Sequence, residues 1–550
     1  MKENRADKKF VLVLLRKTKK RGKNNPSFKM IVKIKFIYIH TKPHLDFYYS
    51  SKPAKSKETK RGDVMKKKIC RKILFFLIVV AISFYFLVVR RDTNMVLSNV
   101  QANFQNLEIW LTTVDQKNLL KKQNTSDFVK KNVNKSKYII KIDPKKKYQT
   151  MEGFGASLTD ASAYLIAKVL PENEREKVLK KLFDYKEGIG ISFLRQPMGA
   201  SDYATKIYSY DDMPKDKSDF ELKHFSINHD KEYIIPLLKK AMQINKQLKI
   251  MATPWSPPGW MKATDNMIGG SLWPDCYEVY ANYFVKFINE YKKEGIEIYA
   301  ITPQNEPLYV PPHYPGMSMS AEEQAEFIKN YLGPAFKKNN IKTKILCYDH
   351  NWDVPEYVMT VYKDKEAYKY ISGSAWHCYA GSHETMTKIH NLFPDKEIWF
   401  TEASGGEWIP AFEKAFLDQM MHVIRAPRNW AETVVWWNIA LDENNGPTVL
   451  PHSTCRGLVK IEQKTKKVIY NVDYYTLGHI SKFVKPGAVR IDSNTYQNDL
   501  ENVAFLNPDK SVVLIISNRT SESKIATVQY LNKNFNIYIP PKAAMTLCWK

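Results

Sequence analysis

Two glutamates in this chain are placed where a pair of carboxyl groups can carry out acid–base chemistry. Glu306 lies in the run Thr-Pro-Gln-Asn-Glu-Pro at residues 302–307, and Glu402 lies in Trp-Phe-Thr-Glu-Ala at residues 399–403. Hydrolysis of a glycosidic bond needs one carboxyl group to protonate the leaving oxygen and a second to attack or stabilise the anomeric carbon. The sequence therefore predicts a site for glycosidic hydrolysis, with Glu306 and Glu402 as its catalytic pair.

The elements that must position this pair are predicted from the pattern of apolar runs. The two glutamates are 96 residues apart, which fits strands four and seven of a (β/α)8 barrel, where catalytic residues follow different strands. Apolar runs that end in polar, Pro or Gly turns predict eight strands, and amphipathic stretches between them predict helices. The predicted strands are residues 153–157, 191–196, 249–255, 298–303, 344–348, 374–379, 398–401 and 433–439. Alternating strands and helices are typical of a parallel α/β fold, so we predict a TIM barrel.

The chain divides into five predicted segments. The first is Lys-rich and has no fold pattern, so we expect it to be disordered or to be a wrongly assigned start that precedes Met65. The segments are residues 1–64, the signal anchor at 65–92, a linker with N-terminal strands at 93–147, the catalytic barrel at 148–484 and C-terminal strands at 485–550.

The signal-anchor prediction is based on the apolar run Ile73–Val89, which is 17 residues long and follows a cluster of basic residues. This length is at the lower limit for a membrane-spanning helix. The charge bias places the N-terminus in the cytoplasm and the catalytic region outside the membrane. No small-residue cleavage site follows the run, which favours an uncleaved anchor; cleavage would instead give a secreted protein.

A net charge of +27 could indicate nucleic-acid binding, but most of this charge lies in the N-terminal segment. Residues 1–92 carry 26 Lys and Arg against 6 Asp and Glu, which accounts for +20 of the total. The remaining 458 residues carry only +7, and no nucleic-acid motif accompanies this charge. We therefore predict no nucleic-acid partner.

The cysteines and histidines do not predict a metal or cofactor site. The six cysteines have no metal-ligand spacing and are too sparse for a disulfide scaffold. His377 stands beside Cys378, but one His without spaced partners is a weak signal for a metal ligand. We expect no metal and no cofactor.

Five motifs together resemble glycoside hydrolase family 30, the glucosylceramidase family. The resemblance covers roughly Asn106 to the C-terminus, with the motifs in the expected order. The motifs are residues 153–160, 195–202 and 254–262, and the two glutamate motifs. The resemblance implies a TIM barrel with a side β-sandwich formed from both ends of the globular region, and a retaining mechanism. Strand-like runs at residues 107–113 and 138–142, and again from 503 to 539, agree with such a sandwich.

The resemblance also implies roles for the site residues. Glu306 is then the general acid/base and Glu402 the nucleophile. Two carboxyl groups about 5 Å apart repel each other when both are ionised, which raises the pKa of one of them. We therefore predict that Glu306 is protonated near neutral pH. Arg195 is implied to keep Glu402 ionised, with a structural ion pair as its alternative role. Asn305 is implied to contact the 2-hydroxyl of the sugar, with turn chemistry as the alternative.

Further implied contacts surround the sugar. Asp202 and Trp255 are implied to bind its outer hydroxyls, and Trp437 to pack against the ring. For the tryptophans, ordinary core packing is the alternative. Tyr314 and His377 match active-site positions of the family, with satisfied polar core residues as the alternative.

The substrate is less defined than the reaction. Cys378 and the loop Leu450–Gly457 resemble the bacterial branches of the family, which include enzymes that act on β-1,6-glucans. We expect a glucosylceramidase, with a β-1,6-glucanase or another β-glucosidase or β-xylosidase as the alternative. Two other classes of protein are the remaining alternatives. An inactive, membrane-tethered carbohydrate-binding protein would lack one of the two catalytic carboxylates, and a structural cell-surface protein would lack the converging acid pair. Both glutamates are present.

Overall fold

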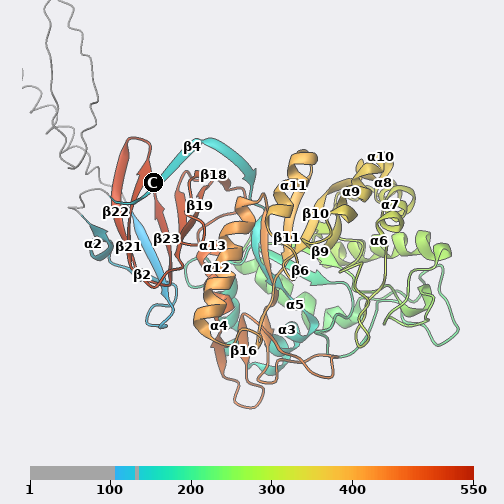
Figure 1. Ribbon diagram of the computed structural model, residues 1–550. Coiled ribbons are helices and arrows are strands. Elements are labelled where there is room, and N and C mark those ends of the chain that lie inside the picture. Colours follow the sequence, from blue (N-terminus) through green and yellow to red (C-terminus); the bar gives the residue numbers. More distant parts are fainter. Residues whose placement is uncertain (1–105, 131–135) are drawn as a thin grey trace, which may run out of the picture. The chain divides into compact units, whose positions relative to one another are not determined.

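The computed structural model describes residues 106–130 and 136–550 (Figure 1). The predicted segments 1–64 and 65–92, including the apolar run 73–89, lie outside the described residues, so the predicted anchor stays a prediction. Within the described ranges, no helix combines the length and the hydropathy needed to cross a membrane.

Eight parallel strands close into a barrel in the order β10-β11-β13-β5-β6-β7-β8-β9. The barrel prediction is confirmed, and each of the eight predicted strands overlaps an observed one. The strands are β5 (Gly153–Ser157), β6 (Phe193–Pro197), β7 (Lys249–Thr253), β8 (Ala300–Ile301), β9 (Lys344–Asn351), β10 (Ile371–His377), β11 (Glu397–Glu402) and β13 (Thr433–Asn438). Glu306 follows β8, and Glu402 ends β11, so both lie at the carboxyl end of the barrel, as expected for catalytic residues of this fold.

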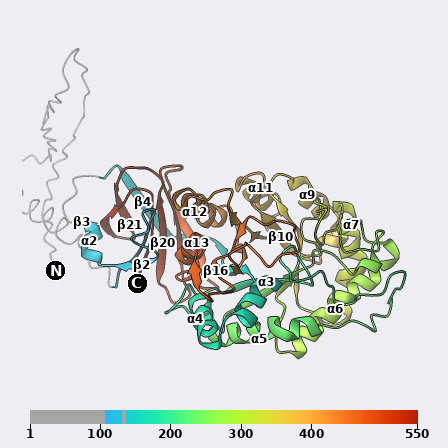
Figure 2. The same ribbon diagram turned by 90° about the horizontal axis from the view of Figure 1, so that it is seen from below.

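Helices cover the outside of the barrel (Figure 2). One of them, α7, begins with a capping box: the Ser320 hydroxyl accepts from the backbone N–H of Glu323, and the Glu323 carboxylate accepts from that of Ser320. This cap ends the loop that carries Glu306. The helices that follow the start of the barrel are α3 (Asp160–Tyr164), η1 (Leu165–Val169), α4 (Glu172–Phe183), α5 (Asn228–Ile244), η2 (Gly259–Met261), η3 (Pro274–Cys276), α6 (Tyr277–Lys293), α7 (Ala321–Phe327), η4 (Ile328–Leu332), α8 (Gly333–Lys338), α9 (Pro355–Lys363), α10 (Lys365–Tyr368), α11 (Glu384–Leu392), α12 (Phe412–Arg428) and α13 (Val472–Ser481). The short α2 (Thr125–Phe128) belongs to the second domain instead.

Short strands stiffen the loops after β11 and β13 at the carboxyl end of the barrel. The strand β12 (Gly405–Gly406) pairs with β15 (Cys455–Arg456), and β14 (Ala440–Leu441) pairs with β16 (Val459–Ile461), which pairs with β17 (Val468–Tyr470). The loop that follows the nucleophile candidate Glu402 is therefore hydrogen-bonded to the loop after β13.

The second domain is a ten-stranded sheet formed from both ends of the described chain, in the order β2-β1-β23-β20-β19-β18-β4-β21-β22-β3. The first strand, β1, pairs with the last, β23, and the long β4 lies between β18 and β21. Its apolar residues form a core separate from that of the barrel. The strands are β1 (Glu108–Thr113), β2 (Lys121–Gln123), β3 (Val129–Lys130), β4 (Tyr138–Thr150), β18 (Val489–Ser493), β19 (Leu500–Leu506), β20 (Val512–Asn518), β21 (Lys524–Tyr530), β22 (Lys533–Ile539) and β23 (Ala543–Trp549).

Polar contacts join the barrel to this sheet. His479 on α13 is fully buried and hydrogen-bonds Thr546 of β23 and Thr112 of β1. Arg425 on α12 forms two hydrogen bonds with the carboxylate of Glu501 in β19. Because strands from both ends of the described chain make these contacts, the sheet supports α12, which packs against β13, and α13, which packs against β5.

A layer of buried side chains fills the barrel interior, and β5 contributes a glycine at this level. Seven barrel strands each supply one residue to the layer, whereas Gly155 of β5 is paired in register with Phe193 and Val435. A Cβ atom on Gly155 would lie 1.8 Å from the backbone oxygen of Phe193. The glycine is therefore required by the close approach of the β6 backbone.

We predict that Gly155→Ala lowers the free energy of unfolding by about 3 kcal/mol, because the backbone of β6 cannot move away without distorting the barrel. The control is Gly295→Ala after helix α6, where φ is +79° and nothing lies within 4 Å. There only the left-handed backbone opposes alanine, at about 1 kcal/mol. Urea denaturation of both variants checks this. Equal losses would show that the close approach in the barrel does not limit this position.

Candidate active site

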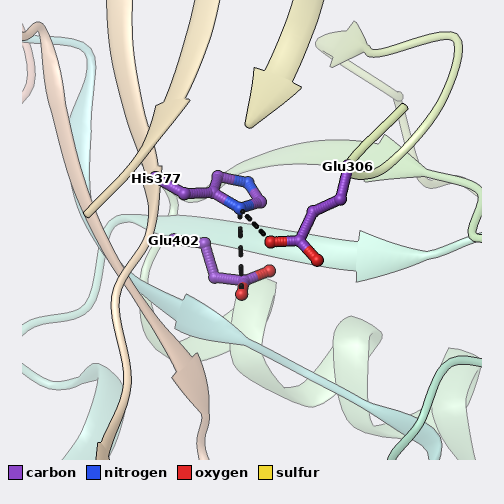
Figure 3. Close-up of side chains that lie close together, drawn as sticks. All are labelled: Glu306, His377 and Glu402. Carbon is purple, nitrogen blue, oxygen red and sulfur yellow. Dashed lines mark hydrogen bonds and ion pairs between the residues drawn. The ribbon is translucent and has the colours of Figure 1, made fainter. Parts of the chain in front are cut away.

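The two predicted catalytic glutamates come together at the mouth of the barrel, with His377 between them (Figure 3). Nδ1 of His377 lies 3.3 Å from Oε1 of Glu306 and 4.0 Å from Oε1 of Glu402. One nitrogen or oxygen atom from each of the three side chains lies within 4.8 Å of the other two. Inverting glycosidases hold their carboxyl groups about 6.5–9.5 Å apart to admit a water molecule, whereas retaining enzymes hold them at about 5 Å. The close approach of the two carboxyl groups fits the spacing of retaining enzymes better than that of inverting ones.

Both oxygens of the Glu402 carboxylate accept a strong hydrogen bond. Arg195 Nη1 donates to Oε2 at 2.5 Å, and the hydroxyl of Tyr379 donates to Oε1 at 2.7 Å. Donors of this kind stabilise the ionised form of a carboxyl group. The contact between Arg195 and Glu402 is the one that the sequence predicts. Tyr379 was not predicted, although its position two residues after His377 at the end of a predicted strand is a usable signal.

Asp349 connects these side chains, and the sequence analysis did not identify it. It is fully buried and accepts hydrogen bonds from Arg195 Nη2 at 2.9 Å and from His377 Nε2 at 3.0 Å. Three hydroxyl groups also donate to its carboxylate: those of Thr253, Thr302 and Thr401. Burial raises the pKa of Asp349, but Arg195 and His377 more than offset this, so its pKa is lowered and it stays ionised. Its place at the carboxyl end of the fifth barrel strand could have marked it.

The surroundings of His377 and Glu306 shift their pKa values in opposite directions, which favours the proton on His377. Burial lowers the pKa of His377, but the charge of Glu402 and the bonds to Asp349 and Glu306 together raise it to about 9. Burial raises the pKa of Glu306, yet the hydrogen bond and charge of His377 outweigh it, so the pKa of Glu306 lies below its usual value. The lowered pKa of Glu306 is opposite to the prediction of a protonated Glu306, because the cation of His377 lies next to its carboxyl group.

The backbone holds Glu306 in place. Its N–H donates to the carbonyl of Asp349 at 3.0 Å, and the N–H of Asn305 donates to the carbonyl of Pro254 at 2.9 Å. Glu306 has φ of +46°, a left-handed conformation that costs a residue with a side chain about 1–2 kcal/mol. Arg195 donates to Oδ1 of Asn305 at 2.6 Å. The side-chain oxygen of Asn305 therefore already accepts a hydrogen bond, whereas its amide nitrogen is available to donate to a substrate hydroxyl.

The predicted tryptophans form one wall beside these charges. The rings of Trp255 and Trp437 stack with centroids 4.9 Å apart at 25°. The Arg195 guanidinium lies 4.9 Å from the first ring and 5.5 Å from the second. Tyr314 is partly buried and packs against the same cluster. All of these predicted residues are thus brought together, and the tryptophans serve as packing partners of Arg195 as well as candidate sugar contacts.

Asp202 completes the set of predicted residues. Burial raises the pKa of Asp202 well above its usual value, and repulsion from Glu402 and Glu306 adds to the effect. Its Oδ1 atom is buried without a hydrogen-bond partner. A carboxyl group with an unpaired oxygen beside the catalytic pair is suited to bind a sugar hydroxyl, which can both donate and accept.

Within residues 106–130 and 136–550, two groups of side chains have the donor atoms to hold a metal ion. The first is Glu306, His377 and Glu402, but Arg195 and Tyr379 already occupy both oxygens of Glu402. The second is Glu152, Glu397 and Glu432 at the opposite end of the barrel. There Lys249 and Lys344 form ion pairs with Glu152, and Lys344 also forms an ion pair with Glu397. Both arrangements favour pairing by protein cations.

Comparison with known proteins agrees with this geometry. Residues 151–484 match the model of the glycosyl hydrolase family 30 TIM-barrel domain, and residues 487–547 match the model of the glycosyl hydrolase family 30 beta sandwich domain.

Some of the similar proteins are named glucosylceramidase and others endo-1,6-beta-glucanase. Putative glucosylceramidase 2 of Caenorhabditis elegans is 32% identical over 434 residues, which is 74% of this chain and 82% of the relative. An endo-1,6-beta-D-glucanase of Neurospora crassa is 34% identical over 410 residues, which is 72% of this chain and 84% of the relative. The solved structure of the endo-beta1,6-glucanase BT3312 is similar with a TM-score of 0.74 and 34% identity, over 81% of this chain and 99% of that chain.

We predict that Asp202→Ala lowers kcat/KM for an aryl β-glucoside by roughly 30- to 700-fold, which corresponds to about 2–4 kcal/mol of lost transition-state binding. The melting temperature should change little, because Oδ1 has no partner in the protein. The control is Glu221→Ala, an exposed carboxylate in the same loop. A folded Asp202→Ala variant with the activity of the wild type would remove Asp202 from the site.

Proposed function

The chain belongs to glycosyl hydrolase family 30, and on this premise we propose that it is a retaining β-glucosidase whose substrate is glucosylceramide. The observation that carries the retaining mechanism is the approach of the Glu306 and Glu402 carboxylates to within 4.8 Å. The relatives named glucosylceramidase support the choice of substrate.

In this mechanism Glu402 attacks the anomeric carbon while Glu306 protonates the leaving oxygen, which gives a glycosyl-enzyme and a free aglycone. Arg195 and Tyr379 each donate a hydrogen bond to the Glu402 carboxylate and so hold it in place for the attack. His377 holds the proton in the free site 3.3 Å from Glu306. It can pass that proton to Glu306 when the leaving oxygen arrives. Glu306 then deprotonates the water that hydrolyses the glycosyl-enzyme.

The surroundings of Glu306 favour an aglycone with an apolar part. Three consecutive residues directly after Glu306-Pro307 expose large apolar side chains: Leu308 at 47%, Tyr309 at 46% and Val310 at 43%. They lie on the loop of the proposed acid/base, which is the side of the site where the leaving group departs. Apolar surface of this kind is suited to the hydrocarbon part of a glycolipid.

A β-1,6-glucan is the second candidate substrate. It is favoured by the identity of 34% to both the Neurospora crassa glucanase and BT3312, and by the coverage of 99% of the BT3312 structure. The same pair of glutamates would serve this reaction, since both substrates are cleaved at a β-glucosidic bond. An internal glucosyl unit of the glucan also carries the next sugar on its 6-oxygen.

We expect higher kcat/KM on glucosylceramide in detergent micelles than on β-1,6-glucan. Replacing Leu308, Tyr309 and Val310 together by serine should lower kcat/KM for glucosylceramide about tenfold or more, equivalent to about 1.4 kcal/mol. Hydrolysis of a nitrophenyl β-glucoside should change little, because its aglycone is small. Leu531→Ser is the control, since Leu531 is 65% exposed but lies outside the barrel. Higher kcat/KM on the glucan would select the second candidate.

The roles of the two glutamates are tested by the configuration of azide products. Glu402→Ala should be inactive, and azide should restore a glucosyl azide of inverted configuration, because the anion attacks from the vacated nucleophile position. Glu306→Ala should act only on activated substrates such as a dinitrophenyl glucoside, and azide should then give the retained configuration. Glu407→Ala, an exposed glutamate on the same loop as Glu402, should behave as the wild type. The opposite configurations would exchange the two roles.

A further inference from the structure

Lys262 is a buried lysine without an acidic partner close to the active site. Its side chain is 1% exposed. Its Nζ donates to the hydroxyl of Ser256 at 3.0 Å, to the carbonyl of Met267 at 2.7 Å and to the carbonyl of Gly316 at 2.8 Å. An ammonium group has three donors and no acceptor, so every N–H of Lys262 is used. Burying a charge without a counter-ion is costly, which points to a purpose for this arrangement.

The three acceptors belong to two loops at the carboxyl end of the barrel. Ser256 and Met267 lie in the β7–α6 loop (residues 254–273), which carries Trp255, and Gly316 lies in the β8–α7 loop (residues 302–320). The N–H of Gly316 also donates to the carbonyl of Met267 at 3.0 Å. Lys262 therefore closes a junction at which both loops meet.

The same two loops meet again beside the reacting groups. The Gln304 side chain donates to the carbonyl of Trp255 at 2.7 Å, and the Asn305 N–H bonds the carbonyl of Pro254. Glu306 follows directly in the chain. A change in the distance between the loops at Lys262 is thus transmitted to the acid/base on one loop and to the tryptophan wall on the other.

We propose that Lys262 is a positioning residue for hydrolysis: its ammonium group holds the loop of Trp255 against the loop of Glu306. A displacement of about 1 Å at a reacting group can cost about 100-fold in rate. The inference rests on the hydrolysis of a β-glucoside by this site, and not on the identity of the aglycone.

The protonation of Lys262 gives this role a measurable signature. Burial lowers the pKa of Lys262 to about 7, and none of the charged groups in the described surroundings of Lys262 offsets this. As the pH rises through this value, Nζ loses a proton and one of its three donors. One of the three oxygens then loses its hydrogen bond, and the junction weakens. The activity should therefore fall on the alkaline side for a reason separate from His377, whose pKa lies higher.

The test compares the wild type with Lys262→Met, which keeps the length of the side chain but has no donors. Lys206→Met is the control, because Lys206 is exposed in a neighbouring loop. For an aryl β-glucoside, Lys262→Met should lose about 10- to 100-fold in kcat/KM. It should also lack the decline that the wild type shows between pH of about 6 and 8. A folded variant with the kcat/KM and the pH profile of the wild type overturns the inference.

Two further measurements keep the test decisive. Hydrogen exchange of residues 302–320 should be faster in Lys262→Met than in Lys206→Met, a readout that needs no substrate; unchanged exchange counts against the junction. If Lys262→Met does not fold, an NMR titration of the Lys262 side chain in the wild type, followed by its Cε chemical shift, replaces it. Its titration should coincide with the decline in kcat/KM, and a mismatch overturns the inference. Failure of the wild type on every β-glucoside, with faster exchange in Lys262→Met, would refute the proposed function and leave the loop junction supported.

Discussion

The guanidinium of Arg195 is the group on which the catalytic end of the barrel depends. It is fully buried, so its charge must be compensated within the protein. Asp349 and Glu402 supply this compensation, and Asn305 accepts a further hydrogen bond. Removing one partner of a buried ion pair costs about 3–5 kcal/mol, since a charge is left unpaired. The strands β6, β9 and β11 and the end of β8 are therefore held in one arrangement by a single side chain.

The same network determines where the proton resides before the reaction. Asp349 engages Nε2 of His377, so Nδ1 is directed toward Glu306 and Glu402. Two carboxylates so close together favour a cation between them, and the imidazole provides it. The proton is thus stored next to the acid/base and is not fixed on it. In the proposed mechanism, a leaving oxygen that develops negative charge beside Glu306 shifts the proton to that carboxyl group.

The sequence predicted the barrel well because its strands are buried on both faces and read as apolar runs that end in polar turns. It also predicted both glutamates, since each stands at the end of such a run. It missed Asp349 and Tyr379, whose roles arise from contacts between strands that are far apart in the chain. It assigned the proton to Glu306, because the pairing of His377 with two glutamates is a property of the packed site. Lys262 lies in a motif that the sequence identified, but the three acceptors of its ammonium group come from two loops.

Under the proposed function, sugar and aglycone would contact different parts of this structure, and the two parts are under different constraints. The sugar contacts Trp255, Trp437 and Asn305 are buried and bonded to the Arg195 network, so a substitution there disturbs the catalytic charges as well. The residues after Glu306 are exposed and pack little, so they can vary at small cost in stability. A change of aglycone therefore needs only a change of loop, whereas a change of sugar needs a new arrangement around Arg195. This difference accounts for relatives with two kinds of substrate in their names that align over the same barrel.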